Sequence, residues 1–305
     1  MGSKGKVSEQ RVLVTTFLVD LLDVAINLVV AIVTGSVVML AEFFQGLADL
    51  TAAGLLLIGY KRSKRRADKQ HPFGYGKEIY FWTLISAVVM MTFTAVASFY
   101  FGLMRVLEPE EIDYIWLGYL TLLITLGSNA YALSLSSDRL LKNKPLKELP
   151  KQFLNARDVT VKNALVLDLM GTSAALFGLI ALLLYQFAGI KQFDGIGAMI
   201  VGVTTAVLAV VLITGLRGLL VGERAAPEIE AKIKDAALTI RQVKEVADLR
   251  TMQIGPNKLL VNIEVNVANK LETDELEALI DRIKKRIEEK VPSVKIVQVE
   301  LETPK

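Results

Sequence analysis

The sequence predicts an α-helical membrane protein with six transmembrane helices and a small cytoplasmic α+β domain. Hydrophobic residues make up 52% of the 305 residues, and the mean hydropathy of +0.44 is high for a soluble domain of this length. Six apolar stretches are long enough to cross a hydrocarbon core about 30 Å thick. After Gly222 the composition changes to alternating charges with helical and strand periods.

The six predicted spans follow one another with short or basic connections. They are approximately Val12–Val33, Val37–Gly59, Ile79–Met104, Tyr114–Ser137, Asn163–Ile190 and Gly195–Leu216. The third, fourth and sixth contain no Asp, Glu, Lys or Arg, which makes these three the most strongly predicted.

Basic residues are concentrated in two of the connections, and this bias predicts the orientation. The connection between spans two and three carries Lys61, Arg62, Lys64, Arg65, Arg66, Lys69 and Lys77. The connection between spans four and five carries Arg139, Lys142, Lys144, Lys147, Lys151, Arg157 and Lys162. We therefore expect both connections and both termini in the cytoplasm, with the chain in the cell (inner) membrane.

The carboxy-terminal region predicts a layer of order αββαβ. Its expected elements are a helix at Pro227–Ile240, strands at Val243–Ile254 and Lys258–Val267, a helix N-capped by Thr273, and a strand at Ser293–Leu301. The predicted organisation is a cytoplasmic N-terminus (1–11), a transmembrane domain (12–222) and a cytoplasmic domain (223–305). We interpret the last as a regulatory or dimerisation domain.

The composition excludes several classes of function. A net charge of +3 gives no reason to expect nucleic-acid binding, and the absence of cysteine excludes disulfides and thiolate sites. His71 is the only histidine, so a histidine-rich zinc site is excluded. No nucleophile–base pair, Walker A or metalloprotease motif occurs, so we expect no enzyme, no catalytic residue and no ATP-driven transport.

Five carboxylates fall within the predicted spans, and no Lys or Arg accompanies them there. They are Asp20, Asp23, Glu42, Asp49 and Asp168. An ionised acid near the bilayer centre costs roughly 2.5–3.5 kcal/mol on insertion scales. These groups must therefore be protonated or neutralised by cations from outside the chain. Alternation between the two states is what a cation/proton antiporter requires.

The spacing of these residues suggests an ion-binding surface. Two spans carry polar residues at i, i+3 and i+7, which lie on one helix face. These are Asp20, Asp23 and Asn27 on the first span, and Glu42, Gln45 and Asp49 on the second. Asp168 stands alone in the fifth. Carboxylate and amide oxygens suit hard divalent cations, and zinc also accepts carboxylates.

The alternative is that these side chains join helices as polar contacts within the membrane. This reading has most weight for Asp20 and Asp23, in the half of the first span nearer the cytoplasm, and for Gln45. Glu42 lies nearer the outer end of its span, where contact of its carboxylate with water is an alternative to a functional role. Asp49 and Asp168, deep in their spans, favour a functional role.

Two motifs resemble the cation diffusion facilitator family. The first is Gly35-Ser36, Leu40-Ala41-Glu42 and then Gln45-Gly46-Leu47-Ala48-Asp49, which is similar to the family's second-helix signature; the second is His71-Pro72-Phe73-Gly74-Tyr75-Gly76-Lys77, which is similar to its loop motif. The segment around Asp168, Asp194 before the sixth span and the αββαβ tail also fit. The resemblance covers essentially the whole chain.

The resemblance implies a homodimer that moves Zn²⁺, Mn²⁺ or a related ion against protons, with a ferredoxin-like cytoplasmic domain that pairs the protomers through 223–305. The family's transport site would fall at Gln45, Asp49, Ala164 and Asp168. Gln45 is a weaker ligand than the usual residue and Ala164 is no ligand, so the chain resembles a divergent branch with an altered metal site. Glu42 or the first-helix acids are candidates to compensate.

Three functional hypotheses follow. The leading one is a cation/proton antiporter that exports zinc or a related ion from the cytoplasm. The second is a carrier for manganese or another hard divalent cation. The third is a non-transporting membrane regulator with a degraded metal site.

Overall fold

The structure is a computed structural model that describes residues 9–141, 144–156, 159–267 and 272–302. Side chains are described from Leu21 onward, except that of Asn155. Contacts divide the chain into two units. Of the described residues, the first contains 9–58, 82–141, 144–156 and 160–214, and the second contains 59–81, 159, 215–267 and 272–302.

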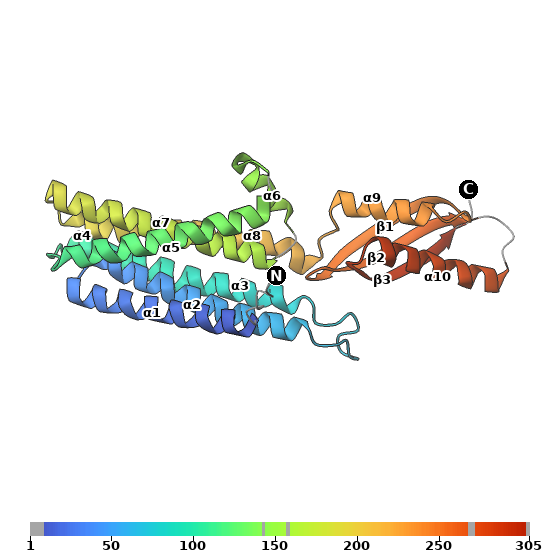
Figure 1. The fold of residues 1–305 in the computed structure, drawn as a ribbon, viewed down its shortest axis with the longest axis horizontal. Coiled ribbons are helices and arrows are strands. Elements are labelled where there is room, and N and C mark those ends of the chain that lie inside the picture. The colour runs from blue at the N-terminus through green and yellow to red at the C-terminus, as the bar shows by residue number, and fades with distance from the viewer. Residues whose placement is uncertain (1–8, 142–143, 157–158, 268–271, 303–305) are drawn as a thin grey trace, which may run out of the picture. The chain divides into compact units, whose positions relative to one another are not determined.

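Long helices run alongside one another through the first part of the chain (Figure 1). Their bounds are α1 (Glu9–Thr34), α2 (Val37–Ser63), α3 (Glu78–Met90), α4 (Val96–Leu107), α5 (Ile115–Leu141), α7 (Val159–Ala188) and α8 (Gln192–Val221). A short 3₁₀ turn at Leu146–Glu148 leads into α6 (Leu149–Asn155) between α5 and α7. The sequence pattern did not predict α6.

The third span is one helix with a local change in winding. A π-helical segment at Met91–Ala95 joins α3 to α4, so that Glu78–Leu107 runs on as a single apolar helix. The Thr94 hydroxyl donates to the Phe44 carbonyl on α2 at 3.0 Å. A single-turn π segment inside an α-helix is frequent near functional sites, and this one contacts α2 next to Gln45.

Among the described residues, five helical segments have the length and composition to cross a membrane. They are Val37–Ser63, Glu78–Leu107, Ile115–Leu141, Val159–Ala188 and Gln192–Val221. The described part of α1, Leu21–Thr34, is a shorter apolar helix. The helices correspond to the six predicted spans, so the predicted α-helical membrane architecture is confirmed.

Three of these helices contain charged residues that the predicted spans excluded. The helix of the third span includes Arg105, α5 extends past Ser137 to include Asp138 and Arg139, and α8 includes Arg217. The predicted bounds followed the apolar runs, whereas a helix continues into the interface, where Asp138, Arg139 and Arg217 are exposed and Arg105 is buried. The three apolar runs are free of charged residues as predicted, and the helices that contain them extend further along the chain.

Small residues bring α4 and α8 into close contact. A Cβ added to Gly102 would lie 2.6 Å from the Gly195 carbonyl oxygen, and one added to Gly195 would lie 2.5 Å from that of Gly102. Any side chain at either position would collide with the facing backbone. Close backbone approach through small residues is how helices associate in membranes, where burial of apolar surface gives no driving force.

The second unit contains the predicted αββαβ layer. Its elements are α9 (Pro227–Leu238), β1 (Val243–Gly255), β2 (Lys258–Val267), α10 (Thr273–Lys290) and β3 (Val294–Glu302). The sheet order is β1-β2-β3, with β1 antiparallel and β3 parallel to β2. Figure 1 shows α9 and α10 along this sheet.

Strict alternation along β2 builds the core of this layer. Buried residues of β2 such as Val261 and Ile263 share one cluster with Ile233 of α9 and with Leu279 and Ile283 of α10. The strand-period and helix-period patterns therefore predict the packing correctly. The predicted N-cap is wrong by one residue, because Glu272 caps α10 and forms a reciprocal capping box with Glu275.

Candidate functional site

Polar side chains of α1 and α2 meet where a glycine opens space between the helices. The Asn27 side-chain amide donates to Asp23 Oδ2 at 3.1 Å. A Cβ added to Gly46 on α2 would lie 3.9 Å from the same Asp23 oxygen and 3.0 Å from Val24 Cγ2. The lack of a side chain at Gly46 therefore makes room for Val24 of α1, and the Asp23 oxygen lies within ordinary contact distance of this position on α2.

Glu42 lies beside this contact and is buried. Its side chain is 3% exposed, so the alternative that Glu42 reaches water is wrong. The Asp23 and Asp49 carboxylates are close enough to interact electrostatically with it. In the described part of the chain, Glu42 Oε1 and Asn27 Oδ1 are buried oxygens with no hydrogen-bond partner. Such groups are costly unless a ligand, a proton or water satisfies them.

Gln45 is held on both sides of its amide. Its Nε2 donates to Asp49 Oδ1 at 3.1 Å, and its Oε1 accepts a bond from the Thr205 hydroxyl of α8 at 3.3 Å. Gln45 and Thr205 are both 2% exposed. Gln45 therefore orients the Asp49 carboxylate and connects it to α8, a role that its position in the sequence did not indicate.

Asp168 has a different environment on α7. The Ser136 side chain forms a hydrogen bond with the Asp168 carboxylate, and Arg139 interacts with it electrostatically. The Thr172 hydroxyl donates to the Asp168 backbone carbonyl at 2.6 Å and so leaves the carboxylate free of that contact. The expectation that the buried acids lack basic companions is therefore wrong for Asp168, because α5 is longer than the apolar run that predicted it.

The predicted site residues thus form one cluster and one separate group. Asp23, Asn27, Glu42, Gln45 and Asp49 lie together between α1, α2 and α8, and we call these five residues the α1–α2 cluster. Over the ranges that the structure describes, no three acidic or histidine side chains are close enough to hold one metal ion. Neither Asp168 nor Asp23 therefore completes a preformed three-carboxylate metal site with Glu42 and Asp49. The Asp20 side chain lies outside the described residues.

Three residues near these acids were missed from the sequence. Thr205, Ser136 and Arg139 contact Gln45 or Asp168. The hydroxyl pair Thr204-Thr205 inside a strongly apolar helix was a usable signal for the first. Ser136 lies in the run Ser134-Leu135-Ser136-Ser137, and nothing in that run singled it out from its neighbours. Ala164 precedes Asp168 by one turn and brings no donor atom.

Comparisons with known proteins match the whole length of this arrangement. The model of the cation efflux transmembrane domain matches residues 13–220, and that of the cation efflux protein cytoplasmic domain matches residues 225–303. The human proton-coupled zinc antiporter SLC30A9, mitochondrial, is 25% identical over 244 residues, which are 79% of this chain and 43% of the relative. The metal tolerance protein C4 of Arabidopsis thaliana is 24% identical over 263 residues, which are 84% of this chain and 57% of that protein.

The chain therefore spans about half the length of these two relatives. Among solved structures, a nickel form of the MamM carboxy-terminal domain covers 26% of this chain and 100% of its own, at 16% identity and a TM-score of 0.25. The family models cover the transmembrane helices that carry the α1–α2 cluster and Asp168 as well as the αββαβ layer. The chain belongs to the cation efflux, or cation diffusion facilitator, family.

Proposed function

We propose that this protein carries a divalent metal cation, zinc or a related ion, across a membrane in exchange for protons. The observation that carries the proposal is Glu42, a buried carboxylate with an unbonded oxygen and two further carboxylates nearby. Membership of the cation efflux family supports transport of a metal cation. The human relative, named as a proton-coupled zinc antiporter, supports the choice of ion and of proton exchange.

The physical argument concerns countercharge. Burial of an ionised acid in the bilayer costs roughly 2.5–3.5 kcal/mol on insertion scales, and three neighbouring acids also repel one another. A divalent cation or protons can each neutralise Asp23, Glu42 and Asp49. A site that holds one or the other exchanges metal for protons when it faces alternate sides of the membrane.

We assign different roles to the site residues. Glu42 and Asp49 are proposed as cation ligands, with Asp23 and the free Oδ1 of Asn27 as supporting oxygens. Gln45 is proposed to orient Asp49 through its side-chain amide.

Asp168 and Asp20 complete the assignment. Asp168, which contacts Ser136 and interacts with Arg139, is proposed as a separate binding site on the cation's path. Arg139 supplies the countercharge for Asp168 when the cation is absent. Asp20 is kept as a lower-ranked candidate, from the sequence pattern alone.

The donor chemistry favours a second candidate cargo. Every proposed ligand in the α1–α2 cluster is a carboxylate or amide oxygen, and oxygen ligands suit Mn²⁺ and Mg²⁺ better than they suit softer ions. Zinc sites more often include nitrogen or sulfur ligands. Competition between Zn²⁺ and Mn²⁺ for the same uptake distinguishes the two cargoes.

The cytoplasmic layer is proposed to pair two protomers through residues 223–305, since the matching family model describes a cytoplasmic domain of this kind and is named for dimerisation.

The proposed orientation places both termini and the basic connections in the cytoplasm, with export from that side. The chain has no cysteine, so single cysteines introduced at Lys64 and at Glu111 can report sidedness with an impermeant maleimide. Labelling of both from the same side would contradict this orientation.

The decisive experiment measures ion flux into liposomes that contain the purified protein. Zinc or manganese uptake driven by an imposed pH gradient is expected for the native chain and is expected to fall strongly in Glu42→Gln and Asp49→Asn. Asp138→Asn, an exposed acid on α5, is the matched control and should keep native flux. Flux that ignores the pH gradient would exclude proton exchange. Native flux in both cluster variants would exclude the proposed site.

A further inference from the structure

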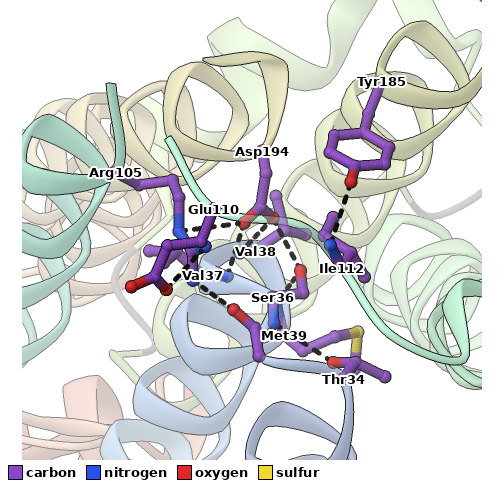
Figure 2. A network of polar contacts seen from close by, with 11 residues as sticks. Thr34, Ser36, Val37, Val38, Met39, Arg105, Glu110, Ile112, Tyr185 and Asp194 are labelled. Carbon is purple, nitrogen blue, oxygen red and sulfur yellow. Dashed lines mark hydrogen bonds and ion pairs between the residues drawn. The ribbon is translucent and has the colours of Figure 1, made fainter. Parts of the chain in front are cut away.

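Asp194 lies at the start of α8 but binds the N-terminus of α2. Its carboxylate is completely buried and accepts three hydrogen bonds from α2. The Ser36 hydroxyl donates to Oδ1 at 2.6 Å, the Val37 amide to Oδ2 at 2.8 Å, and the Val38 amide to Oδ1 at 3.0 Å (Figure 2). An anion at this position also interacts favourably with the helix dipole. A side chain from a distant helix therefore caps α2.

The remaining amides at this end of α2 are satisfied locally. The Ser36 amide donates to the Thr34 hydroxyl at 3.2 Å, and the Met39 amide donates to the Ser36 hydroxyl at 3.4 Å. The first turn of a helix leaves its amides without partners in the helix itself. Here Asp194 supplies the acceptors for two of these amides, and it also fixes the Ser36 hydroxyl that serves a third.

Arg105 extends this contact to α4. Its Nε lies 3.6 Å from Asp194 Oδ2, its Nη1 lies 3.0 Å from Glu110, and its Nη2 donates to the Gly35 carbonyl. Arg105 is 8% exposed, so the guanidinium is held with little access to water. Figure 2 shows Arg105 and Ser36 converging on Asp194 from different helices. We call Ser36, Arg105 and Asp194 the α2 clamp.

The clamp lies a short way along α2 from the α1–α2 cluster. Glu42 follows Ser36 by six residues, which corresponds to about 9 Å along the axis of a helix with a 1.5 Å rise per residue. Gln45 lies one turn further on. A continuous helix transmits a shift or rotation of its first turn to side chains at this distance.

We propose that Asp194 is a positioning residue that sets the height and rotation of α2, and thereby places Glu42 and Gln45 for cation binding. The inference rests on the proposed function for its consequence, because only a bound cation reports the placement of these side chains. Asp194 itself binds no cation, since its oxygens are occupied by α2 and Arg105. Three helices, α2, α4 and α8, are joined at this one carboxylate.

The test compares Asp194→Asn and Ser36→Ala with the native chain in two measurements. The first is hydrogen exchange of the cation-free full-length protein, followed in peptides that cover residues 35–42. The second is the zinc concentration that gives half-maximal flux in liposomes, separated from the maximal rate. Asparagine has the shape of aspartate but lacks its charge and has only one oxygen acceptor, so it should loosen the first turn of α2 without removing volume.

We expect both variants to exchange faster in residues 35–42 and to need a several-fold higher zinc concentration, while peptides of α5 and α7 keep native exchange. Glu111→Gln is the matched control, because Glu111 is exposed and pairs with Lys191 at 2.8 Å without contacting the clamp residues. A loss of folded protein alone lowers the maximal rate and leaves the half-saturating concentration unchanged.

Two results would overturn the inference: native exchange in residues 35–42 of Asp194→Asn, or an unchanged half-saturating concentration with faster exchange. A native chain that moves neither zinc nor manganese counts instead against the proposed function, and the exchange measurement still decides whether Asp194 holds α2.

Discussion

The hydroxyl of Thr205 on α8 donates to the side-chain oxygen of Gln45 on α2 at 3.3 Å. Gln45 in turn donates to Asp49 at 3.1 Å, so a chain of two hydrogen bonds connects α8 to a proposed ligand. Thr205 and Gln45 are both buried, and a buried bond of this kind fixes geometry because no water replaces it. The position that resembles a family ligand is therefore occupied by a residue that hydrogen-bonds to the proposed ligand Asp49.

Replacement of Thr205 by valine should weaken cation binding without abolishing it. Valine keeps the shape of threonine but leaves the Gln45 oxygen without its donor. Loss of a hydrogen bond worth about 0.5–1.5 kcal/mol corresponds to a roughly two- to tenfold higher dissociation constant. Titration calorimetry of the purified protein with zinc measures this change. Thr214→Val on the same helix, where the hydroxyl is exposed and bonds its own helix, should bind as the native chain does.

Arg139 should limit the attraction of Asp168 for a cation. Its guanidinium interacts with the Asp168 carboxylate and also repels an approaching metal ion. Arg139→Gln is therefore expected to tighten binding at Asp168 and to slow release, so that the half-saturating concentration and the maximal rate of flux both decrease. Lys144→Gln, which removes a positive charge from the connection after α5, is the control and should keep native flux. If Arg139→Gln instead weakens binding, Arg139 holds Asp168 in place and does not compete with the cation.

The sequence predicts most of the fold and about half of the candidate site. A long apolar run crosses a membrane as a helix, and strict alternation forms a strand with one buried face. The membrane helices and the αββαβ order therefore follow from these patterns. The clustering of Glu42, Gln45 and Asp49 follows from helical spacing. The Thr205–Gln45, Arg139–Asp168 and Asp194–Ser36 contacts do not, because each joins helices whose relative rotation is set by packing of the whole bundle.

The exact ends of helices were also beyond the sequence. Arg139 lies beyond the apolar run but inside α5, and that extension brings it to Asp168. Hydropathy identifies where a helix is apolar and not where its backbone stops being helical. Among the residues that the structure describes, the charged companion of Asp168 was therefore one that lies just outside the predicted span.

The stability of the cytoplasmic layer should decrease as the pH rises above the ordinary glutamate value. Glu264 on β2 shares a hydrogen bond with Glu302 on β3, and Asp248 and Glu300 lie nearby, so the pKa of Glu264 is raised from its ordinary value of 4.5. The folded layer then binds more protons than the unfolded chain just above pH 4.5. The contribution of Glu264 to the stability of the layer is complete below pH 4.5 and is lost as the pH rises through the raised pKa of Glu264.

Glu264→Gln should therefore flatten this pH dependence and make the layer more stable than the native one at neutral pH. Pulse proteolysis of the full-length protein over a urea series, at about pH 5 and about pH 8, measures both effects. Glu288→Gln, an exposed residue of α10, should leave the native pH dependence unchanged. An equal effect of both substitutions would mean that total charge, and not the contact between Glu264 and Glu302, sets the dependence.

Gly102→Ala should separate α4 from α8 and destabilise the membrane helices. The added Cβ would lie 2.6 Å from the Gly195 carbonyl oxygen and 2.8 Å from Met199, and a backbone oxygen cannot move aside as a flexible side chain can. Overpacking of this kind costs about 1–3 kcal/mol. Gly127→Ala on α5 is the matched control, since a Cβ there meets nothing within 4 Å. In an open helical position alanine is favoured over glycine by roughly 1 kcal/mol, so this variant should be as stable as the native chain or more stable. Thermal unfolding in detergent, followed by the fluorescence of Trp82 and Trp116, separates the two variants by the sign of the shift in melting temperature.

The separation of α4 from α8 also draws Arg105 away from Asp194, so Gly102→Ala should additionally speed hydrogen exchange at the start of α2. If the melting temperature falls and that exchange stays native, the α2 clamp does not depend on the contact between α4 and α8.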